Sequence, residues 1–218
     1  MVEVTVPRGR TGDRCLPHLI DGVETPGLAG RTFTTVDPAT SAELVTLAFG
    51  ESEDVDRGVA AAAAAAHRDR RWSGLAPQER AESLRAVGRC IRQRAEEIAK
   101  VESADTGKPL AHARAEIEGA AHGFSHYADL VRQPTGMVYP ADADRFLYSR
   151  RIPYGVVAAI SPWNYPWLRS PATWGRGRLG TRAPVWGGQG RACLDRACIR
   201  PDPPRTGLGT YVLDRRVR

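Results

Sequence analysis

Lysine is almost absent from this sequence: only Lys100 and Lys108 occur, so 29 of the 31 basic residues are arginine. This bias, together with the alanine, glycine and proline content, indicates a GC-rich coding sequence and says nothing about function. Residues 171–218 contain ten Arg and three Asp, a net charge of +7, whereas residues 1–170 carry 21 basic and 22 acidic residues. The body of the chain therefore lacks the basic surface that nucleic-acid binding requires.

Cysteines and long apolar runs are also scarce. Cys15, Cys90, Cys193 and Cys198 are too few and too scattered for a disulfide framework in 218 residues, so a reducing cytoplasm is the expected location. The N-terminal residues lack the apolar segment of a signal peptide. The longest apolar run, Val59–Ala66, is far too short to span a bilayer. We therefore expect a cytoplasmic protein without membrane contact.

The first third of the chain predicts short strands and then a helix. The strands are expected at Leu19–Glu24, around an Asp-Gly turn, and at Thr32–Val36 and Leu44–Phe49. The helix is expected from an N-cap at Ser52 to about Arg70, because this segment contains seven consecutive alanines.

Two further helices are predicted by apolar residues at three- and four-residue steps. The first begins at Pro77, which suits a first helical turn, and ends at Gly107 in a left-handed stop. Gly88 should weaken it by about 1 kcal/mol relative to alanine. The two apolar faces comprise Leu84, Val87, Ile91, Ala95, Ile98 and Val101, and then Ala113, Ile117, Ala120, Phe124, Tyr127 and Val131 before the break at Pro134. Met137–Tyr139 and Phe146–Arg151 then predict a β-hairpin.

The segment after this hairpin is the most informative part of the chain. Residues 155–160, GVVAAI, suit a parallel strand buried on both faces, and Ser161-Pro162 ends it. Ligands of open α/β sheets bind beyond the carboxyl ends of the strands, where Trp163 and Asn164 follow. The Asn164 amide can donate to a developing oxyanion without bringing a charge. Because one parallel strand is not a sheet, its partners must come from further along the chain or from another molecule.

The stretch GVVAAISPWNYP, residues 155–166, resembles the strand and turn that open the nucleotide-binding domain of the NAD(P)-dependent aldehyde dehydrogenases. Earlier segments agree with that family in order and spacing, and several separated signals are more specific than one short motif. These segments are Ile20-Asp21-Gly22, Val36-Asp37-Pro38-Ala39-Thr40, Asp54-Val55-Asp56, Trp72, Glu79-Arg80 and Asp105-Thr106-Gly107-Lys108-Pro109. The resemblance covers roughly residues 19–168.

The resemblance implies the N-terminal part of an aldehyde dehydrogenase-like α/β fold. Short strands, three helices and a hairpin would precede the first parallel strand of an incomplete Rossmann-like sheet. It also implies oxidation of an aldehyde to a carboxylic acid with NAD or NADP. In that family a cysteine thiolate attacks the aldehyde, and the matching position assigns Asn164 as the side-chain donor to the resulting oxyanion. Ile160, Ser161, Pro162 and Trp163 match the segment that lies against the cofactor.

Other parts of that chemistry have no counterpart: the nucleophilic cysteine, the general-base glutamate, the phosphate-binding turn and the ribose-binding Lys and Glu. Gly188–Cys193 resembles the nucleophile segment, but its spacing is one residue out and it follows Asn164 too closely. Gly175–Gly180 matches G-x-G-x-x-G but has no strand directly before it and no helix after it. We therefore expect a truncated oxidoreductase that is inactive alone.

No metal site is expected. His122 and His126 are four residues apart, but the apolar face of their helix lies elsewhere, which favours a solvated pair. Cys193 and Cys198 have no histidine or further cysteine nearby that would complete a zinc site. Asp105–Pro109 is interpreted as a helix end and a turn.

Residues 171–218 lose every periodicity and contain eight Gly and five Pro beside the arginines. We expect a flexible arm at 1–18, the aldehyde dehydrogenase-like portion at 19–168, and a basic tail at 169–218 that is disordered or read out of frame. The alternative hypothesis is a non-enzymatic protein whose tail binds nucleic acid through phosphate contacts and stacking. The oligomeric state cannot be read from the sequence.

Overall fold

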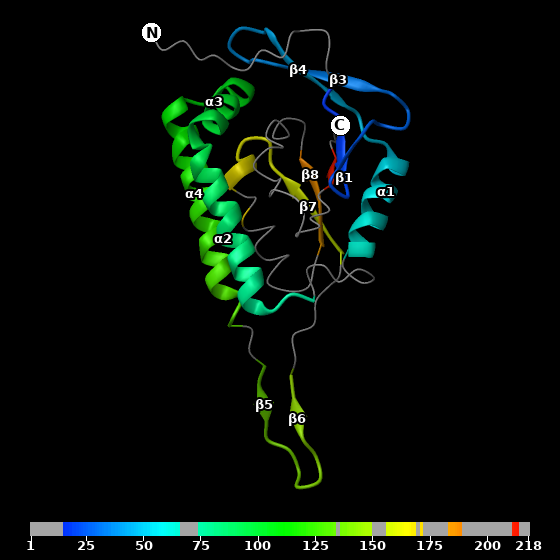
Figure 1. Cartoon of the computed structure of the whole chain (residues 1–218), viewed down its shortest axis with the longest axis vertical. Coiled ribbons are helices and arrows are strands. Elements are labelled where there is room, and N and C mark those ends of the chain that lie inside the picture. The colour runs from blue at the N-terminus through cyan, green and yellow to red at the C-terminus, as the bar shows by residue number, and fades with distance from the viewer. Residues whose placement is uncertain are drawn as a thin grey trace.

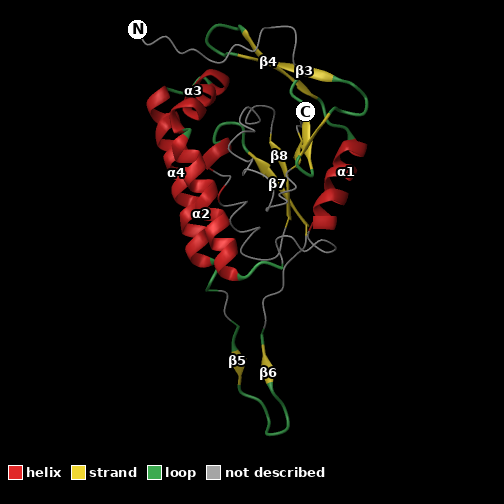
Figure 2. Cartoon of the chain, viewed as in Figure 1, coloured by secondary structure: helices red, strands yellow, loops and turns green. Residues whose placement is uncertain are grey.

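The structure is a computed structural model that describes residues 15–65, 74–133, 136–149, 156–168, 171, 183–188 and 211–213. Within these residues, a small parallel sheet lies between a bundle of helices on one side and a single helix on the other (Figure 1). Figure 2 shows the same layers by type, with the sheet strands between the two groups of helices. This layered arrangement confirms the predicted α/β class.

Two antiparallel hairpins open the described chain; the first was predicted as a strand, turn and strand, and the second pairs two strands that were predicted separately. Strands β1 (His18–Ile20) and β2 (Val23–Thr25) are joined by Asp21 and Gly22, whose φ angles of +49° and +77° form the expected Asp-Gly turn. Strands β3 (Thr32–Val36) and β4 (Glu43–Ala48) pair next. The Asp37 Oδ1 atom accepts the backbone N–H groups of the next turn residues, Ala39 at 2.7 Å and Thr40 at 3.2 Å.

Helix α1 (Ser52–Ala63) begins one residue away from the predicted cap. Glu51 is the N-cap instead of Ser52, because the Asp54 carboxylate accepts the Glu51 N–H at 3.2 Å. The Asp54 carboxylate also accepts the N–H of Leu28 at 3.2 Å and is fully buried. The described helix ends at Ala63, and positions 66–70 of the predicted helix lie outside the described residues.

Three helices form the bundle: α2 (Pro77–Gln93), α3 (Ala95–Thr106) and α4 (Leu110–Leu130). The described chain therefore has four helices, whereas three were predicted, because the helix expected from Pro77 to Gly107 is interrupted at Arg94. The backbone of Arg94 adopts φ −112° and ψ 14°, and its guanidinium pairs with Glu97 at 2.7 Å in the first turn of α3. Pro77 and Gly107 stand where predicted, at the start of α2 and in the left-handed position after α3.

The main hydrophobic core lies where α2, α3 and α4 meet, and β7 contributes to it. Its largest fully buried members are Leu84, Ile91, Ile98 and Ile117, and Ala159 of β7 packs against the same cluster. Gly88 allows α2 to approach α4 closely, because a Cβ atom there would lie 2.9 Å from the backbone oxygen of Ala121. The sequence showed only the propensity cost of this glycine and not its packing role.

Strands β5 (Val138–Tyr139) and β6 (Leu147–Tyr148) form the predicted hairpin, with Val138 opposite Tyr148. The hairpin extends away from the rest of the described structure (Figure 1), and all its residues from Gly136 to Ser149 are exposed. Positions 150–151 of the predicted second strand lie outside the described residues.

The parallel sheet has the order β7 (Val156–Ser161), β8 (Ala183–Gly188), β9 (Tyr211–Leu213). This sheet corrects two expectations. Residues 183–188 and 211–213 of the segment 171–218 do form strands. Pro184, Gly187 and Gly188 disfavour a central strand, so the composition of β8 gives no strand signal. Among the described strands, β7 lies at an edge of the sheet, and its Ala158 is exposed, so it differs from the expected strand buried on both faces. The expectation that its partners come from further along the chain is confirmed.

Candidate active site

The turn that follows β7 presents the predicted catalytic residue. Pro162 to Tyr165 form a turn in which the Tyr165 N–H donates to the Pro162 carbonyl at 3.4 Å. A short helical turn begins at Pro166, and Trp167 packs against the main core cluster. The turn is thus held to the body at its far side, while Trp163 is 53% exposed.

All five predicted site residues are contiguous at the carboxyl end of β7. Ile160 and Ser161 are its last two residues, and their side chains lie outside the described part of the structure. Pro162, Trp163 and Asn164 are exposed. Within the part of the chain that the structure describes, no hydrogen bond to the Asn164 side-chain amide is found, and this amide carries two N–H donors.

Lys108 contacts the candidate site, which the sequence interpretation did not foresee. Its Nζ donates to the backbone carbonyl of Asn164 at 2.8 Å, from a position 56 residues earlier in the chain. The same ammonium donates to Glu102 of α3 at 2.7 Å and to Glu116 of α4 at 2.6 Å. The Asp105–Pro109 segment does end a helix, as interpreted, but its lysine also connects that helix end to the turn that follows β7.

The three charged groups lie well inside the molecule. The exposed fractions of the side chains are 13% for Lys108, 3% for Glu102 and 12% for Glu116. Burial opposes the charge on Lys108, but the hydrogen bonds and charges of both carboxylates outweigh burial and raise the pKa of Lys108. Burial raises the pKa of Glu102, and the contact with Lys108 offsets this effect only in part. The Lys108 ammonium therefore stays protonated at neutral pH.

The loop that carries Lys108 is itself well fixed. Gly107 adopts φ +75°, and a Cβ atom there would lie 2.7 Å from Cγ of Pro38. The Ser103 hydroxyl donates to the Lys108 carbonyl at 2.7 Å. Pro109 then precedes the first residue of α4. A left-handed glycine, the lysine and an N-terminal proline thus turn the chain sharply and direct the lysine toward the strand end.

The other candidates from the sequence are not joined to this turn. His122 and His126 are exposed on α4, away from its buried residues. Cys193, Cys198 and the glycine motif at 175–180 lie outside the described residues, as does 189–193 of the nucleophile-like segment. Across the described ranges, no group of three or more His, Cys, Asp or Glu could hold a metal ion. None of the described helices has the length and apolar character needed to cross a membrane.

A family model and several solved structures were found to resemble this chain, and they point to the same family. The model of the aldehyde dehydrogenase family matches residues 26–174. HpcC from Thermus thermophilus is 27% identical with a TM-score of 0.84, over 97% of this chain and 41% of that one. An aldehyde dehydrogenase from Burkholderia cenocepacia, described as putative, is 30% identical with a TM-score of 0.83, over 91% and 42%. An NAD-dependent aldehyde dehydrogenase from Sinorhizobium meliloti is 28% identical with a TM-score of 0.82, over 97% and 43%.

The chain thus spans about two fifths of the length of these solved structures. A match over 97% of this chain also includes residues beyond 168, where β8 and β9 lie. The family model covers most of the chain, including β7 and the turn that holds Asn164. This chain belongs to the aldehyde dehydrogenase family.

Proposed function

We propose that this chain is the part of an NAD(P)-dependent aldehyde dehydrogenase that supplies the oxyanion donor and one wall of the cofactor site. The observation that carries this proposal is the position of Asn164, in an exposed turn directly after a parallel strand. There its NH₂ is not bound by any other described group. An amide in that position can donate to a negative oxygen without being titrated itself.

The proposed substrate is an aldehyde, which is oxidised to a carboxylic acid. Asn164 would stabilise the oxygen of the tetrahedral intermediate that a cysteine thiolate creates. Ile160, Ser161, Pro162 and Trp163 would lie against NAD or NADP, which supplies a hydride acceptor when bound. The exposed segment Pro162–Trp163 at a strand end fits such a wall, since it offers an uncharged surface beside the sheet.

We further propose that the chain does not oxidise aldehydes by itself. The reaction needs a thiolate of lowered pKa beside the oxyanion donor. Cys15 is exposed before β1 and Cys90 lies on α2, so neither belongs to the Asn164 turn.

We also propose a division of the chain into three parts: an arm at residues 1–18, the family portion at 19–168 and a basic tail at 169–218. We further propose that the protein is cytoplasmic.

The oxyanion role can be tested in a chimera. Residues 19–168 would be joined to the remaining C-terminal part of the Burkholderia cenocepacia relative, whose fold matches with a TM-score of 0.83. We expect aldehyde-dependent reduction of NAD⁺ or NADP⁺, and a 10²- to 10³-fold lower kcat after Asn164→Ala, the usual effect of losing an oxyanion donor. A folded Asn164→Ala chimera with unchanged kcat would disprove the assignment.

The inactivity of the chain alone has a simple test. The purified protein is incubated with a series of aldehydes and either NAD⁺ or NADP⁺, and absorbance at the wavelength of the reduced nicotinamide is recorded. We expect no aldehyde-dependent signal. A rate that depends on both the aldehyde and Asn164 would refute the proposal.

The alternative function, nucleic-acid binding by the basic tail, remains a prediction without support from the described residues. It requires an affinity for single-stranded nucleic acid that falls steeply with salt and disappears when residues 171–218 are deleted.

A further inference from the structure

The ammonium of Lys108 joins three separate elements through its three hydrogens. A lysine ammonium has three N–H donors. One reaches Glu102 on α3, one reaches Glu116 on α4, and the third reaches the Asn164 carbonyl at 2.8 Å. Every donor is thus used, and the acceptors come from two helices and from the turn after β7. The Tyr165 ring also faces the ammonium, with its centroid 5.2 Å from Nζ.

The backbone of Lys108 is held in place as well as its ammonium group. Its backbone carbonyl accepts the Ser103 hydroxyl, and the preceding Gly107 packs closely on Pro38. Its side chain is only 13% exposed, which limits competition from water. A charged donor held at both ends and shielded in this way makes a stronger hydrogen bond than an exposed neutral one.

We propose that Lys108 is a positioning residue, which holds the peptide after Asn164 in one orientation and thereby aims the Asn164 amide. The carbonyl that Lys108 binds belongs to the same residue as that amide. Fixing this carbonyl restricts rotation of the Asn164 backbone, from which the side chain projects. Oxyanion donors work only when they lie about 3 Å from the developing charge, and a displacement of about 1 Å can reduce the rate about 10²-fold.

The catalytic consequence rests on the proposed function, but the positioning itself can be measured without any activity. Asn164 is the only asparagine in the sequence. Labelling with ¹⁵N,¹³C-asparagine therefore gives one backbone amide, one side-chain NH₂ pair and one backbone carbonyl in the NMR spectrum of the full chain. The carbonyl shift reports the hydrogen bond from Lys108, and ¹⁵N relaxation reports the motion of the residue.

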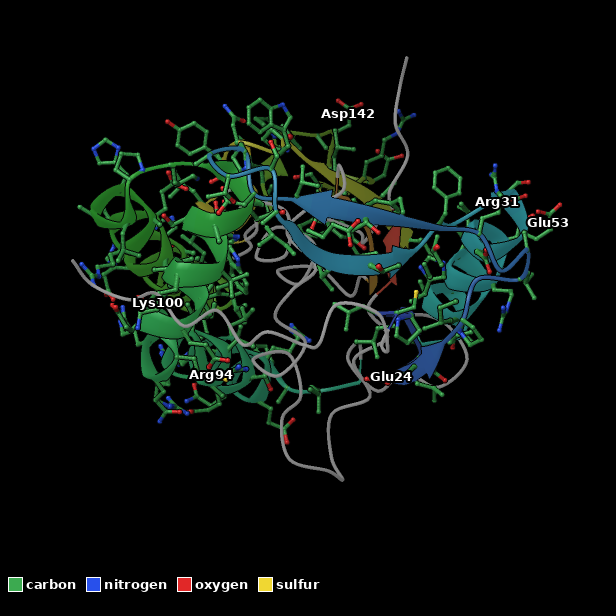
Figure 3. All side chains as sticks on the ribbon, turned by 90° about the horizontal axis from the view of Figure 1, so that it is seen from above. Glu24, Arg31, Glu53, Arg94, Lys100 and Asp142 are labelled. Atoms are coloured by element: carbon green, nitrogen blue, oxygen red, sulfur yellow. The ribbon has the colours of Figure 1, made fainter. Side chains whose placement is uncertain are left out.

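The chain offers a matched control for this experiment. Its only other lysine, Lys100, lies at the outer edge of the bundle (Figure 3) and contacts Glu96 at 3.8 Å. We expect Lys108→Met to shift the Asn164 carbonyl signal and to lower the order parameter of the Asn164 amide from about 0.85 to below about 0.6. Lys100→Met should leave both unchanged, and Lys108→Arg should restore part of the rigidity.

A wild-type measurement covers the possibility that Lys108→Met does not fold. The single backbone carbonyl signal of Asn164 is followed as the pH is raised until Lys108 loses its proton. Glu102, Glu116 and the Tyr165 phenol are the titratable groups that face this lysine. We expect the carbonyl shift to move with the lysine titration, which ¹⁵N-lysine labelling identifies.

Two results would overturn the proposal. One is a folded Lys108→Met protein whose Asn164 signals match those of the wild type, and the other is a carbonyl shift that ignores the lysine titration. Neither depends on the oxyanion role, which the Asn164→Ala chimera tests separately. A chimera that keeps its activity after Asn164→Ala would reject that role and leave the NMR result standing.

Discussion

Asp54 shows how one carboxylate can stabilise two segments of a chain. It is fully buried, accepts the backbone N–H of Glu51 at the start of α1, and accepts the N–H of Leu28 from the loop before β3. Arg57, one turn later, lies 3.5 Å from it. Buried carboxylates are tolerated only when hydrogen bonds and charges compensate them in this way.

Replacing Asp54 by alanine should lower the free energy of unfolding by about 2–3 kcal/mol, because both backbone donors lose their acceptor. Asp56→Ala is the matched control, since Asp56 is exposed on the same helix. It should change the free energy by less than about 0.5 kcal/mol. Urea denaturation of both variants measures the difference, and equal effects would contradict the role assigned to Asp54.

Lys108 should make stability depend on pH in the alkaline range. Its folded pKa lies above its ordinary value, so the folded state holds the proton more tightly than the unfolded chain does. The stabilisation is fully present below about pH 10.4 and is lost as the pH rises through the folded pKa.

We therefore expect Lys108→Met to cost about 3 kcal/mol near pH 8, because it leaves buried carboxylates without their cation. The difference from the wild type should shrink as the pH approaches 12. Denaturant titrations at several pH values check this trend. Lys100→Met should show a small difference at every pH, and a Lys108→Met difference that stays constant with pH would argue against a raised folded pKa.

At the scale of elements, the junction of α3 and α4 depends on one glycine. Gly107 combines a positive φ with close contact to Pro38. Gly22, in the β1–β2 turn, has nearly the same φ, +77°, but nothing lies within 4 Å of the position of a Cβ atom. Substituting each glycine therefore separates two contributions to the free energy of unfolding: the left-handed backbone alone at Gly22, and the backbone together with the Pro38 contact at Gly107.

Gly22→Ala should lower the free energy of unfolding by about 1 kcal/mol, from the left-handed backbone alone. Gly107→Ala should cost more, by a further 1–3 kcal/mol or so, because the new methyl group meets the Pro38 ring. Thermal unfolding of the two variants compares them directly. Similar losses would mean that Pro38 moves away freely.

The structure also explains which elements the sequence could predict. The Asp21-Gly22 turn, Pro77 at the start of α2 and Gly107 after α3 each require a special backbone conformation that few residues adopt, so the sequence signals them. The break at Arg94 has no glycine or proline, and the apolar periodicity continues across it, so it was missed. Strand β9 (Tyr-Val-Leu) is only three residues long, and β8 contains Pro184 and two glycines, which oppose a central strand, so neither carries a clear signal in the sequence.

The sequence could predict the candidate-site residues that are neighbours in the chain, but not the contact with Lys108. Asn164 and its neighbours form one contiguous motif, which the sequence displays directly. Lys108 lies 56 residues earlier and looks like an ordinary turn residue beside Gly107 and Pro109. Its contact with the Asn164 carbonyl arises only when α3, α4 and the turn after β7 come together.

At the scale of the whole molecule, stability is unevenly distributed. The core cluster joins α2, α3, α4 and Ala159, whereas every described residue of the β5–β6 hairpin is exposed. Regions with few buried contacts open at low free energy, and core helices open only with global unfolding.

Hydrogen exchange should therefore be fast at 138–148 and slowest in the facing halves of α2 and α4. Mass spectrometry of exchanged peptides measures this directly, and a brief protease digestion should cut the hairpin before the helices. Slow exchange in the hairpin would show that another surface covers it in solution.

The two lysines also have a practical consequence for attaching the protein to a surface or a dye. The Lys108 amine is protonated, enclosed and bonded three times, so amine-reactive esters should not reach it under native conditions. Lys100 then remains the single lysine side chain open to such reagents, besides the α-amino group. A resin that carries such esters would therefore couple the protein at Lys100 or at the α-amino group, and would leave the contact between Lys108 and the Asn164 carbonyl intact.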